Sequence, residues 1–223
     1  MIKKQSSLKI LRVDPLHPKH ELINEAALVI KNGGVIAFPT QHLYGLGADA
    51  FNADAVNRVF EIKRRPHDKP LLVLIDKPYD LTRLVQQVPY AATRIMERFW
   101  PGAVTIVFKA KHILPINLTA GTERIGVRMP EHPVALALTT AAQGPITATS
   151  ANITGNSGCS LASEMDPLIT DKLDLIIDVG ALKGGMGSTV VDVTGDSPKI
   201  LRQGAVSEKD IFAAVFQKRR NLR

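Results

Sequence analysis

The chain has a single cysteine, Cys159, among its 223 residues. One cysteine excludes an intramolecular disulfide, and it is too few for a zinc site built from thiolates. Proteins of reducing compartments keep few or no disulfides, so this cysteine content predicts a cytoplasmic protein.

Long hydrophobic runs are also missing. The basic start, residues 1–15, lacks the apolar stretch of a secretory signal peptide. Residues 133–163 carry no charge, but their second half is rich in Thr, Ser, Asn and Gly and would not cross a bilayer. With 45% hydrophobic residues and a mean hydropathy of +0.04, the chain is also not disordered. We therefore expect a folded protein that makes no use of a membrane.

The charge is uneven along the chain. Lys and Arg number 28 against 21 Asp and Glu, a net charge of +7. Residues 1–12 and 218–223 hold four cations each and no acid, and without these eight the remainder has 20 bases against 21 acids. A basic excess favours an anionic partner. Because the body of the chain is almost neutral, we expect local cations in a pocket rather than a broad basic face.

Apolar segments alternate with amphipathic ones, which predicts an α/β fold with a sheet covered on both faces. In residues 18–32, Leu22, Ala26 and Ile30 form an apolar stripe that Gly33 and Gly34 end. Further helices are predicted over 54–63, 133–142 and 208–216, with two short ones between 80 and 100. Strands are predicted over 9–13, 35–38, 71–75, 103–108, 125–129, 146–149, 175–179, 189–193 and 200–201.

Several common nucleotide and hydrolase motifs are absent. The glycines Gly45 and Gly47 with Ala50 resemble a dinucleotide-binding fingerprint, but six residues separate them from the preceding strand, whereas that fingerprint needs them in the tight turn itself. Met186 stands where a P-loop would need lysine, and no G-x-S-x-G occurs. His17 and His20 are three residues apart, but near the N-terminus we interpret them as solvated rather than as metal ligands.

Two polar segments suit an anion. Residues 63–69 hold four cations and are constrained by Pro66 and Pro70, and Lys63 continues the apolar stripe of the preceding helix. These cations either bind an anion or stabilise the helix C-terminus. Residues 147–158 follow a strand with hydroxyls, an amide and glycines, which either cradle phosphate oxygens or form a Ser/Asn turn.

Two arginines sit on apolar strands. Arg128 ends the strand over 125–129, and Arg202 follows the strand at 200–201, beyond the glycine-rich residues 184–187. An arginine there is costly to bury without an anionic partner.

Taken together, these segments resemble the YrdC-type threonylcarbamoyl-AMP synthase family. Residues 39–47 are similar to its PT-x-T-x-YGLG segment, and residues 63–66 to its K-x-RP. Residues 101–105, 128–133, 150–155, 188–192 and 201–204 resemble PGP-x-T, R-x-P-x-HP, SAN-x-SG, STVVD and LRPG. The seven segments follow the family's order, and the resemblance runs from about residue 20 to residue 206.

The resemblance implies a fold and an activity. The fold would be a YrdC-like α/β domain with a twisted mixed sheet, flanked by helices, around a basic cavity. We expect this domain over 18–206, after a basic segment and first strand at 1–17 and before a C-terminal helix and basic tail at 207–223, in the single-domain form. The activity would be ATP-dependent synthesis of threonylcarbamoyl-AMP from L-threonine and bicarbonate, with release of pyrophosphate. Downstream tRNA-modifying proteins would then place the group on adenosine 37 of tRNA.

The resemblance also implies residue roles. Lys63 and Arg65 would be catalytic, and no metal would be held by protein side chains, since Mg²⁺ would ride on the phosphates of ATP. The ATP-binding residues would be Arg65, Lys69, Arg124, Ser150, Asn152, Gly158 and Arg202. The threonine-binding residues would be Thr40, His42, Arg128, Ala148 and Ser188, with Arg128 pairing with the carboxylate.

Two residues depart from the family pattern. His42 replaces its second threonine, and Leu74 stands where many relatives carry histidine. We expect both on the amino-acid side, so they bear on substrate identity more than on ATP use. Two alternatives stay open: a non-catalytic module that binds double-stranded RNA, tRNA or rRNA, and carbamoyl-adenylate chemistry on another acceptor.

Overall fold

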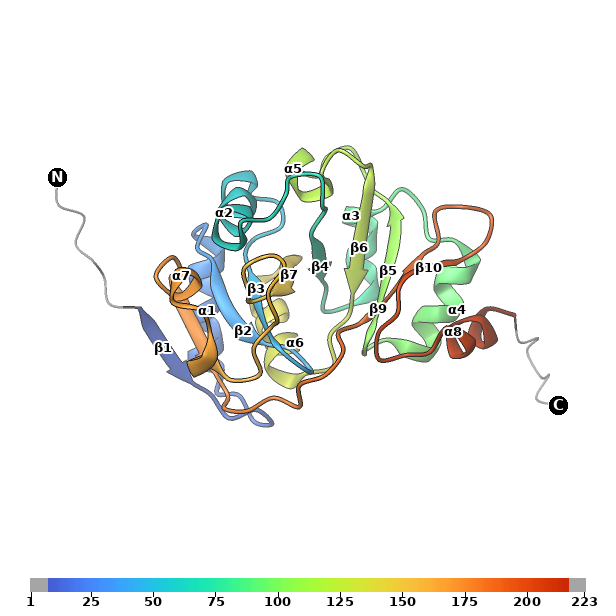
Figure 1. The fold of residues 1–223 in the computed structure, drawn as a ribbon. Coiled ribbons are helices and arrows are strands. Elements are labelled where there is room, and N and C mark those ends of the chain that lie inside the picture. The colour runs from blue at the N-terminus through green and yellow to red at the C-terminus, as the bar shows by residue number, and fades with distance from the viewer. Residues whose placement is uncertain (1–7, 217–223) are drawn as a thin grey trace.

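A strongly twisted sheet of ten strands runs through the protein (Figure 1). The structure is a computed structural model and describes residues 8–216. The strands lie in the order β1-β8-β2-β3-β7-β4-β6-β5-β9-β10. Their bounds are β1 Lys9–Arg12, β2 Ile36–Pro39, β3 Tyr44–Gly47, β4 Leu72–Leu74, β5 Val104–Lys109, β6 Arg124–Arg128, β7 Ile146–Ser150, β8 Leu175–Asp178, β9 Thr189–Asp192 and β10 Lys199–Arg202.

The sheet is mixed, as predicted. The pairs β1–β8, β2–β8, β4–β6 and β5–β9 are parallel, and the other neighbouring pairs are antiparallel. The helices are α1 His20–Lys31, α2 Ala53–Lys63, α3 Leu81–Leu84, α4 Tyr90–Phe99, α5 Ile116–Thr119, α6 Pro133–Ala142, α7 Pro167–Thr170 and α8 Glu208–Phe216, with short 3₁₀ turns at Pro78–Asp80 and Ala162–Glu164. The predicted α/β class is confirmed; the four-residue helices α5 and α7 were not predicted.

Strand β3 was also not predicted, and it explains the glycines that imitate a nucleotide fingerprint. Gly45 and Gly47 lie on β3, which pairs antiparallel with β2 and brings Gly45 opposite Phe38. A Cβ on Gly47 would lie 2.8 Å from the Phe38 ring. These glycines therefore let the Phe38 ring pack flat against β3, and they are not in a phosphate-binding turn.

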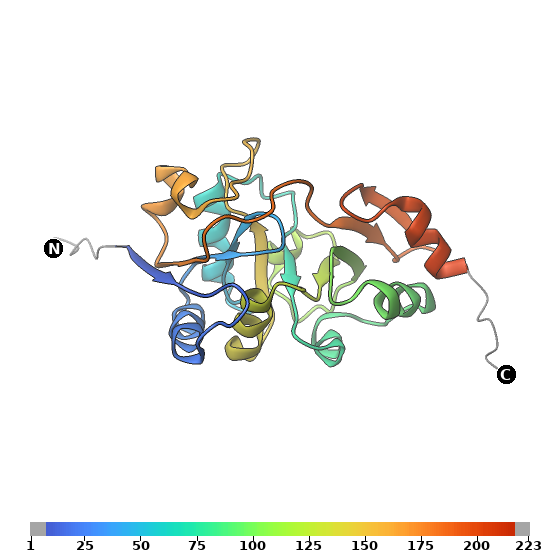
Figure 2. The same ribbon diagram turned by 90° about the horizontal axis from the view of Figure 1, so that it is seen from below.

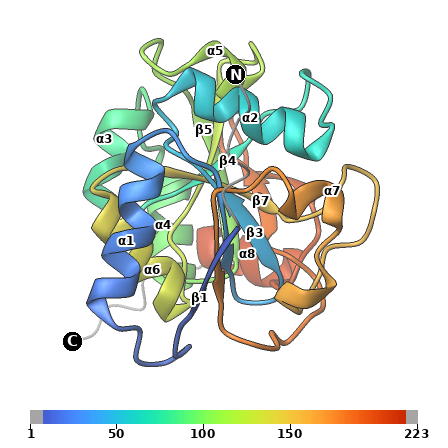
Figure 3. The same cartoon turned by 90° about the vertical axis from the view of Figure 1, so that its left-hand side faces the viewer.

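Alternate residues of each inner strand pack into two separate cores. On β2, Ile36 and Phe38 join the core formed with α1 and α6, whereas Ala37 joins the larger core on the opposite face. Figure 3 shows α1 and α6 on one side of the strands and α7 on the other. Full burial of a side chain such as Phe38 contributes roughly 1.5–3 kcal/mol, so this alternation fixes which face each strand presents.

The α1/α6 face of the sheet turns polar toward the other end. On β6, Ile125 and Val127 are buried in the larger core, so Arg124, Gly126 and Arg128 face the opposite way. Strand β5 continues the pattern, since Thr105 and Val107 share that side. This face carries the candidate site.

A crossing segment joins the two ends of the sheet. Strand β8 is second in the strand order and β9 is ninth, so the residues between them run across the molecule (Figure 2). We refer to residues 180–188 as the strap.

The terminal elements belong to the same body. Strand β1 pairs with β8, and Lys9 forms an ion pair with Glu25 on α1. Helix α8 packs on α4 at the opposite end (Figure 1). The division of the chain at residues 17 and 206 stays a prediction. Lys9 and Arg12 are the basic residues of the two ends that the structure describes, and the remaining ones lie outside the described residues. No helix within 8–216 is long and apolar enough to cross a membrane.

Candidate active site

A cavity of about 790 Å³ lies on the polar part of the α1/α6 face. Its floor is made by alternate residues of β4, β5, β6 and β9, and Gly126 at the centre keeps it flat. A Cβ on Gly126 would lie 3.2 Å from Thr105 and 3.3 Å from Leu72. Residues 40–45, the end of β7 and the strap form the walls. This volume is in the usual range for a pocket that encloses a small organic ligand.

Four arginines line this cavity: Arg65, Arg124, Arg128 and Arg202. Arg65 donates to the carbonyls of Lys69 and Pro70, at 3.0 and 2.9 Å, so its guanidinium is fixed at the cavity rim. Arg202 donates to the Ser188 carbonyl at 2.8 Å. Desolvation lowers the pKa of both arginines, which remain charged near neutral pH.

Of the four cavity arginines, Arg128 is the one least compensated by the described residues. Its Nε is enclosed and has no hydrogen-bond partner among the described residues. Burial, with Arg202 nearby, lowers the pKa of Arg128 to about 10. A guanidinium in this state is costly unless an anion completes its surroundings.

Lys63 lies behind the cavity wall and does not line it. The side chain is 2% exposed at the end of α2, and its Nζ donates to the carbonyl oxygens of Ser150 and Asn152 and to Asn152 Oδ1. Its own carbonyl accepts from Thr154 N at 2.8 Å. Burial, followed by the nearby Arg65, lowers the pKa of Lys63 to about 8. The predicted catalytic contact of Lys63 is therefore not supported by its position, which is that of a brace for the loop after β7.

The conformation of Arg64 separates its two neighbours. Arg64 has a φ of 48° at the C-terminus of α2. This left-handed turn ends the helix. As a result, Lys63 is directed into the loop while Arg65 reaches the cavity.

The loop after β7 is held by its own side chains. Ser150 lines the cavity, and its hydroxyl donates to Asn152 Oδ1. Asn152 in turn donates to the Asn156 carbonyl at 2.6 Å. A Cβ on Gly158 would lie 2.9 Å from Leu43, which lines the cavity. Asn152 and Gly158 thus support the wall from behind, whereas Ser150, the last residue of β7, lines the cavity and residues 151–158 do not.

The residues predicted to bind threonine all come together. Thr40, His42, Arg128, Ala148 and Ser188 line the same cavity although they come from four separate segments. Of the predicted ATP-binding residues, Arg65, Arg124, Ser150 and Arg202 line it too. Lys69 is exposed and does not.

The expectation for Leu74 is wrong. Leu74 is fully buried and packs in the core that contains Val134 and Leu138 of α6. Its neighbour on the same face, Leu72, lines the cavity instead. Leu74 therefore packs under helix α6 as a core residue and does not line the cavity. Of the two departures, His42 alone lies at the cavity.

The strap is tied down along its length. The buried Tyr44 hydroxyl donates to the Gly180 carbonyl at 2.8 Å and accepts from Val179 N at 3.0 Å. Burial raises the pKa of Tyr44 to about 12. His42 is linked twice to Gly184: its Nδ1 lies 2.9 Å from the Gly184 carbonyl, and its own carbonyl accepts from Gly184 N.

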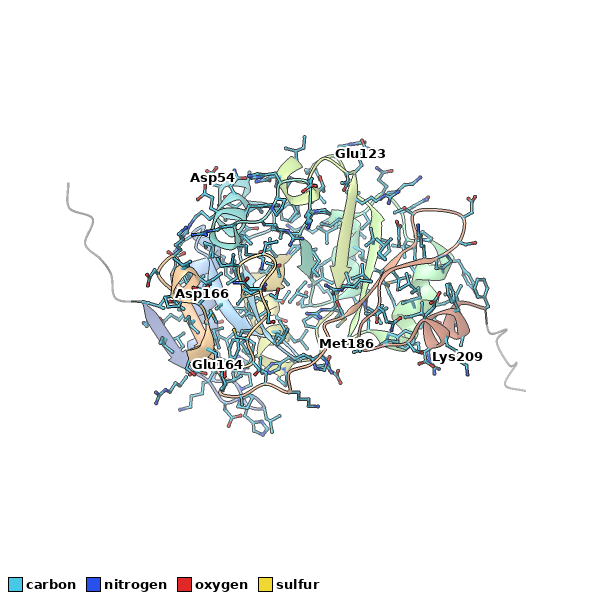
Figure 4. The ribbon with its side chains drawn as sticks, in the orientation of Figure 1. Asp54, Glu123, Glu164, Asp166, Met186 and Lys209 are labelled. Atoms are coloured by element: carbon cyan, nitrogen blue, oxygen red, sulfur yellow. The ribbon has the colours of Figure 1, made fainter. Side chains whose placement is uncertain are left out.

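At its far end the strap meets strand β10. The Ser188 hydroxyl is 2.8 Å from Thr105 Oγ1. A Cβ on Gly204 would lie 2.4 Å from the Gly187 carbonyl oxygen, so only glycine allows this approach. Met186, between the ties at Gly184 and Gly187, is exposed (Figure 4).

Some cavity residues were not predicted as site residues. Thr105, Val107 and Val190 contribute to the floor because of strand alternation. Asp192 does not line the cavity itself but forms an ion pair with Arg124, which does. The period-two pattern of each strand could have suggested which residues share a face, but only the strand order shows that these faces meet.

Known proteins resemble the chain in sequence and in fold. The Sua5/YciO/YrdC family model, described as telomere recombination, matches residues 28–204. The threonylcarbamoyl-AMP synthase of Bacillus subtilis is 38% identical over 203 residues, which is 91% of this chain and 59% of that protein. That of Pyrococcus abyssi is 39% identical, over 85% of this chain and 56% of that protein. The chain thus spans somewhat more than half the length of these curated relatives.

Solved structures also resemble the chain in fold. P. abyssi Sua5 complexed with L-threonine has a TM-score of 0.88 at 37% identity, covering 93% of this chain and 61% of that one. E. coli YciO has a TM-score of 0.83 at 29% identity, covering 92% of this chain and 99% of that one. The predicted fold is therefore confirmed.

Proposed function

Because the chain belongs to the Sua5/YciO/YrdC family, we propose that it catalyses ATP-dependent synthesis of threonylcarbamoyl-AMP from L-threonine and bicarbonate, with release of pyrophosphate. The relatives named for this reaction and the neighbour complexed with L-threonine support the proposal. The observation that carries it in this chain is the cavity with four arginines, in which Arg128 has an enclosed Nε without a partner.

The charge of the cavity suits these substrates. Asp192 is paired with Arg124, which leaves Arg65, Arg128 and Arg202 without an acidic partner among the described ion pairs. Guanidinium groups bind phosphates and carboxylates in a bidentate manner. A nucleoside triphosphate and an amino-acid carboxylate would together neutralise this excess.

We assign the two substrates to adjoining parts of the cavity, which meet where Arg202 donates to Ser188. ATP phosphates would contact Arg65, Arg202 and Ser150. Asn152 and Gly158 would support Ser150 from behind. Arg124 and the exposed Lys69 would also lie toward the nucleotide. Threonine would lie among Thr40, His42, Arg128, Ala148 and Ser188, with its carboxylate on Arg128. Lys63 would act through the loop that presents Ser150.

In the proposed reaction, the threonine amine adds to CO₂ derived from bicarbonate and forms a carbamate. A carbamate oxygen then attacks the α-phosphorus of ATP, and the bond to the β-phosphate oxygen breaks as pyrophosphate leaves. No protein nucleophile is needed, so the protein acts by orienting the reactants and stabilising the developing charge. Mg²⁺ would enter on the ATP phosphates as part of the substrate. Within 8–216, no group of three or more His, Cys, Asp or Glu side chains could hold a metal.

The product is a mixed anhydride and would be consumed by group transfer. We propose that this transfer, by downstream proteins, modifies adenosine 37 of tRNA, and that the protein works in the cytoplasm. An RNA contact by the chain itself remains part of the alternative in which it binds RNA without catalysis.

A pyrophosphate-release assay tests the proposal. Release is expected only when ATP, threonine and bicarbonate are all present, and Arg128→Gln should abolish it. Arg12→Gln is the matched control, because Arg12 is exposed on β1 at the far end of the sheet. Release with a different amine alone would favour another acceptor. No release, together with RNA binding that falls steeply with salt, would favour the RNA-binding module.

A further inference from the structure

Asp192 and Arg124 meet across strand β5. Strand β5 lies between β6 and β9, with Val107 in register with both Gly126 and Asp192. Arg124 comes from the start of β6, and its Nη1 donates to Asp192 Oδ2 at 3.0 Å. The ion pair therefore spans the middle strand at the edge of the cavity.

The two partners differ in how firmly they are held. The Asp192 side chain is 10% exposed, and its other oxygen, Oδ1, accepts from Thr194 N at 2.8 Å and Thr194 Oγ1 at 2.7 Å. The Arg124 side chain is 53% exposed, and in register it faces another cation, Lys109. A fixed carboxylate thus holds a long side chain that would otherwise be mobile and repelled by its neighbour.

We propose that Asp192 is a positioning residue that holds the Arg124 guanidinium at the cavity wall, ready to contact the phosphates of ATP. The inference rests on the proposed function, since it takes ATP as the ligand. Arg124 donates to Asp192 through Nη1, which leaves the other N–H groups of its guanidinium to bind the ligand. Pre-ordering one flexible side chain lowers the entropic cost of binding, which corresponds to about a two- to tenfold gain in affinity.

The sign of the effect separates this role from a purely electrostatic one. An acid near a phosphate site repels the ligand, so removing its charge alone should tighten ATP binding. If Asp192 acts by positioning, removing it should weaken binding by about two- to tenfold, because the ordering cost returns.

The experiment is a double-mutant cycle on MgATP affinity, measured by calorimetry. Asp192→Asn and Arg124→Gln should each weaken binding, and the double variant should bind no worse than Arg124→Gln alone. Thr194→Val, which loosens Asp192 without removing its charge, should give a smaller loss. Binding by Asp192→Asn that equals or exceeds the wild type, or losses that add in the double variant, would overturn the proposal.

Arg124→Lys covers the case in which Asp192→Asn does not fold. Lysine keeps the charge but has one ammonium in place of a fork, so it cannot hold Asp192 and a phosphate in the same geometry. Weaker binding is expected, and unchanged affinity would contradict the inference. A wild-type protein that does not bind MgATP at all would instead refute the proposed function.

Discussion

Replacing Lys63 by methionine tests whether this buried cation braces the loop or contacts the ligand. Methionine preserves the apolar stem and removes the ammonium. That ammonium donates to the carbonyl oxygens of Ser150 and Asn152 and to Asn152 Oδ1, and the residue is 2% exposed. The variant would remove this donor: the Ser150 carbonyl would keep Asn152 N and Asn152 Oδ1 would keep the Ser150 hydroxyl, so the Asn152 carbonyl is the acceptor that loses its partner.

The size of the effect follows from two opposing contributions. Hydrogen bonds from a charged donor contribute about 1.5–3 kcal/mol each, and a buried acceptor left unsatisfied costs about 1–3 kcal/mol. Against this, the lowered pKa of about 8 corresponds to a cost of roughly 3 kcal/mol for burying the charged form. We expect a net loss of about 2–4 kcal/mol, which lowers Tm by roughly 5–15 °C in a chain of this size.

Urea unfolding followed by circular dichroism measures this loss. Lys69→Met is the matched control, because Lys69 lies six residues further on and is exposed; its unfolding free energy should not change. If Lys63 instead contacted the ATP phosphates, its removal would relieve a desolvated cation and leave stability equal or higher. A Lys63→Met protein as stable as the wild type, with weaker ATP binding, would refute the bracing role.

Three further predictions follow from the same contacts. Gly204→Ala should push β10 away from the strap and lower Tm by at least several degrees, whereas Gly195→Ala, where nothing lies within 4 Å, should leave Tm unchanged within about 2 °C in thermal unfolding. His42→Thr removes the side-chain bond to Gly184; steady-state kinetics should show a KM for threonine raised by about three- to tenfold with the KM for ATP unchanged, and equal shifts in both would contradict it. The pKa of Lys63 in the folded protein, about 8, lies below its unfolded value, so the free energy of unfolding should rise between pH 8 and about pH 10.4. Turnover should fall above about pH 8, because Lys63 loses its charge there. A free energy of unfolding that falls over this pH range would contradict the prediction.

Local sequence patterns predicted most of the elements. Helix α2 shows why: Val56, Val59 and Phe60 recur at helical spacing and are all buried. Strand β3 was not predicted because its segment, Tyr44–Gly47, contains two glycines, which are more typical of a loop. The glycines are needed because the Phe38 ring of the neighbouring strand packs against them.

Candidate site residues were identified where a polar group stands out in an apolar or glycine-rich segment. Arg128 and Arg202 are of this kind, and both line the cavity. Leu74 was misjudged, and the catalytic role predicted for Lys63 stays a prediction for a residue that does not line the cavity, because sequence gives no direction for a side chain. At the end of a helix, a lysine can face either side of a wall, and Arg64 in its left-handed conformation decides which.

The linear order of residues was enough for the class of fold, for the helices and strands with regular periodicity, and for the local concentration of cations in an otherwise neutral chain. These features depend on neighbours within a few residues, because hydrophobic spacing and backbone preferences act at short range. The cavity depended on the strand order, which places Arg124 of β6 beside Asp192 of β9 and carries the strap from β8 to β9. Contacts between segments so far apart form only when the whole sheet is assembled, so the use of each charge, to bind a ligand, brace a loop or hold another side chain, was set by packing.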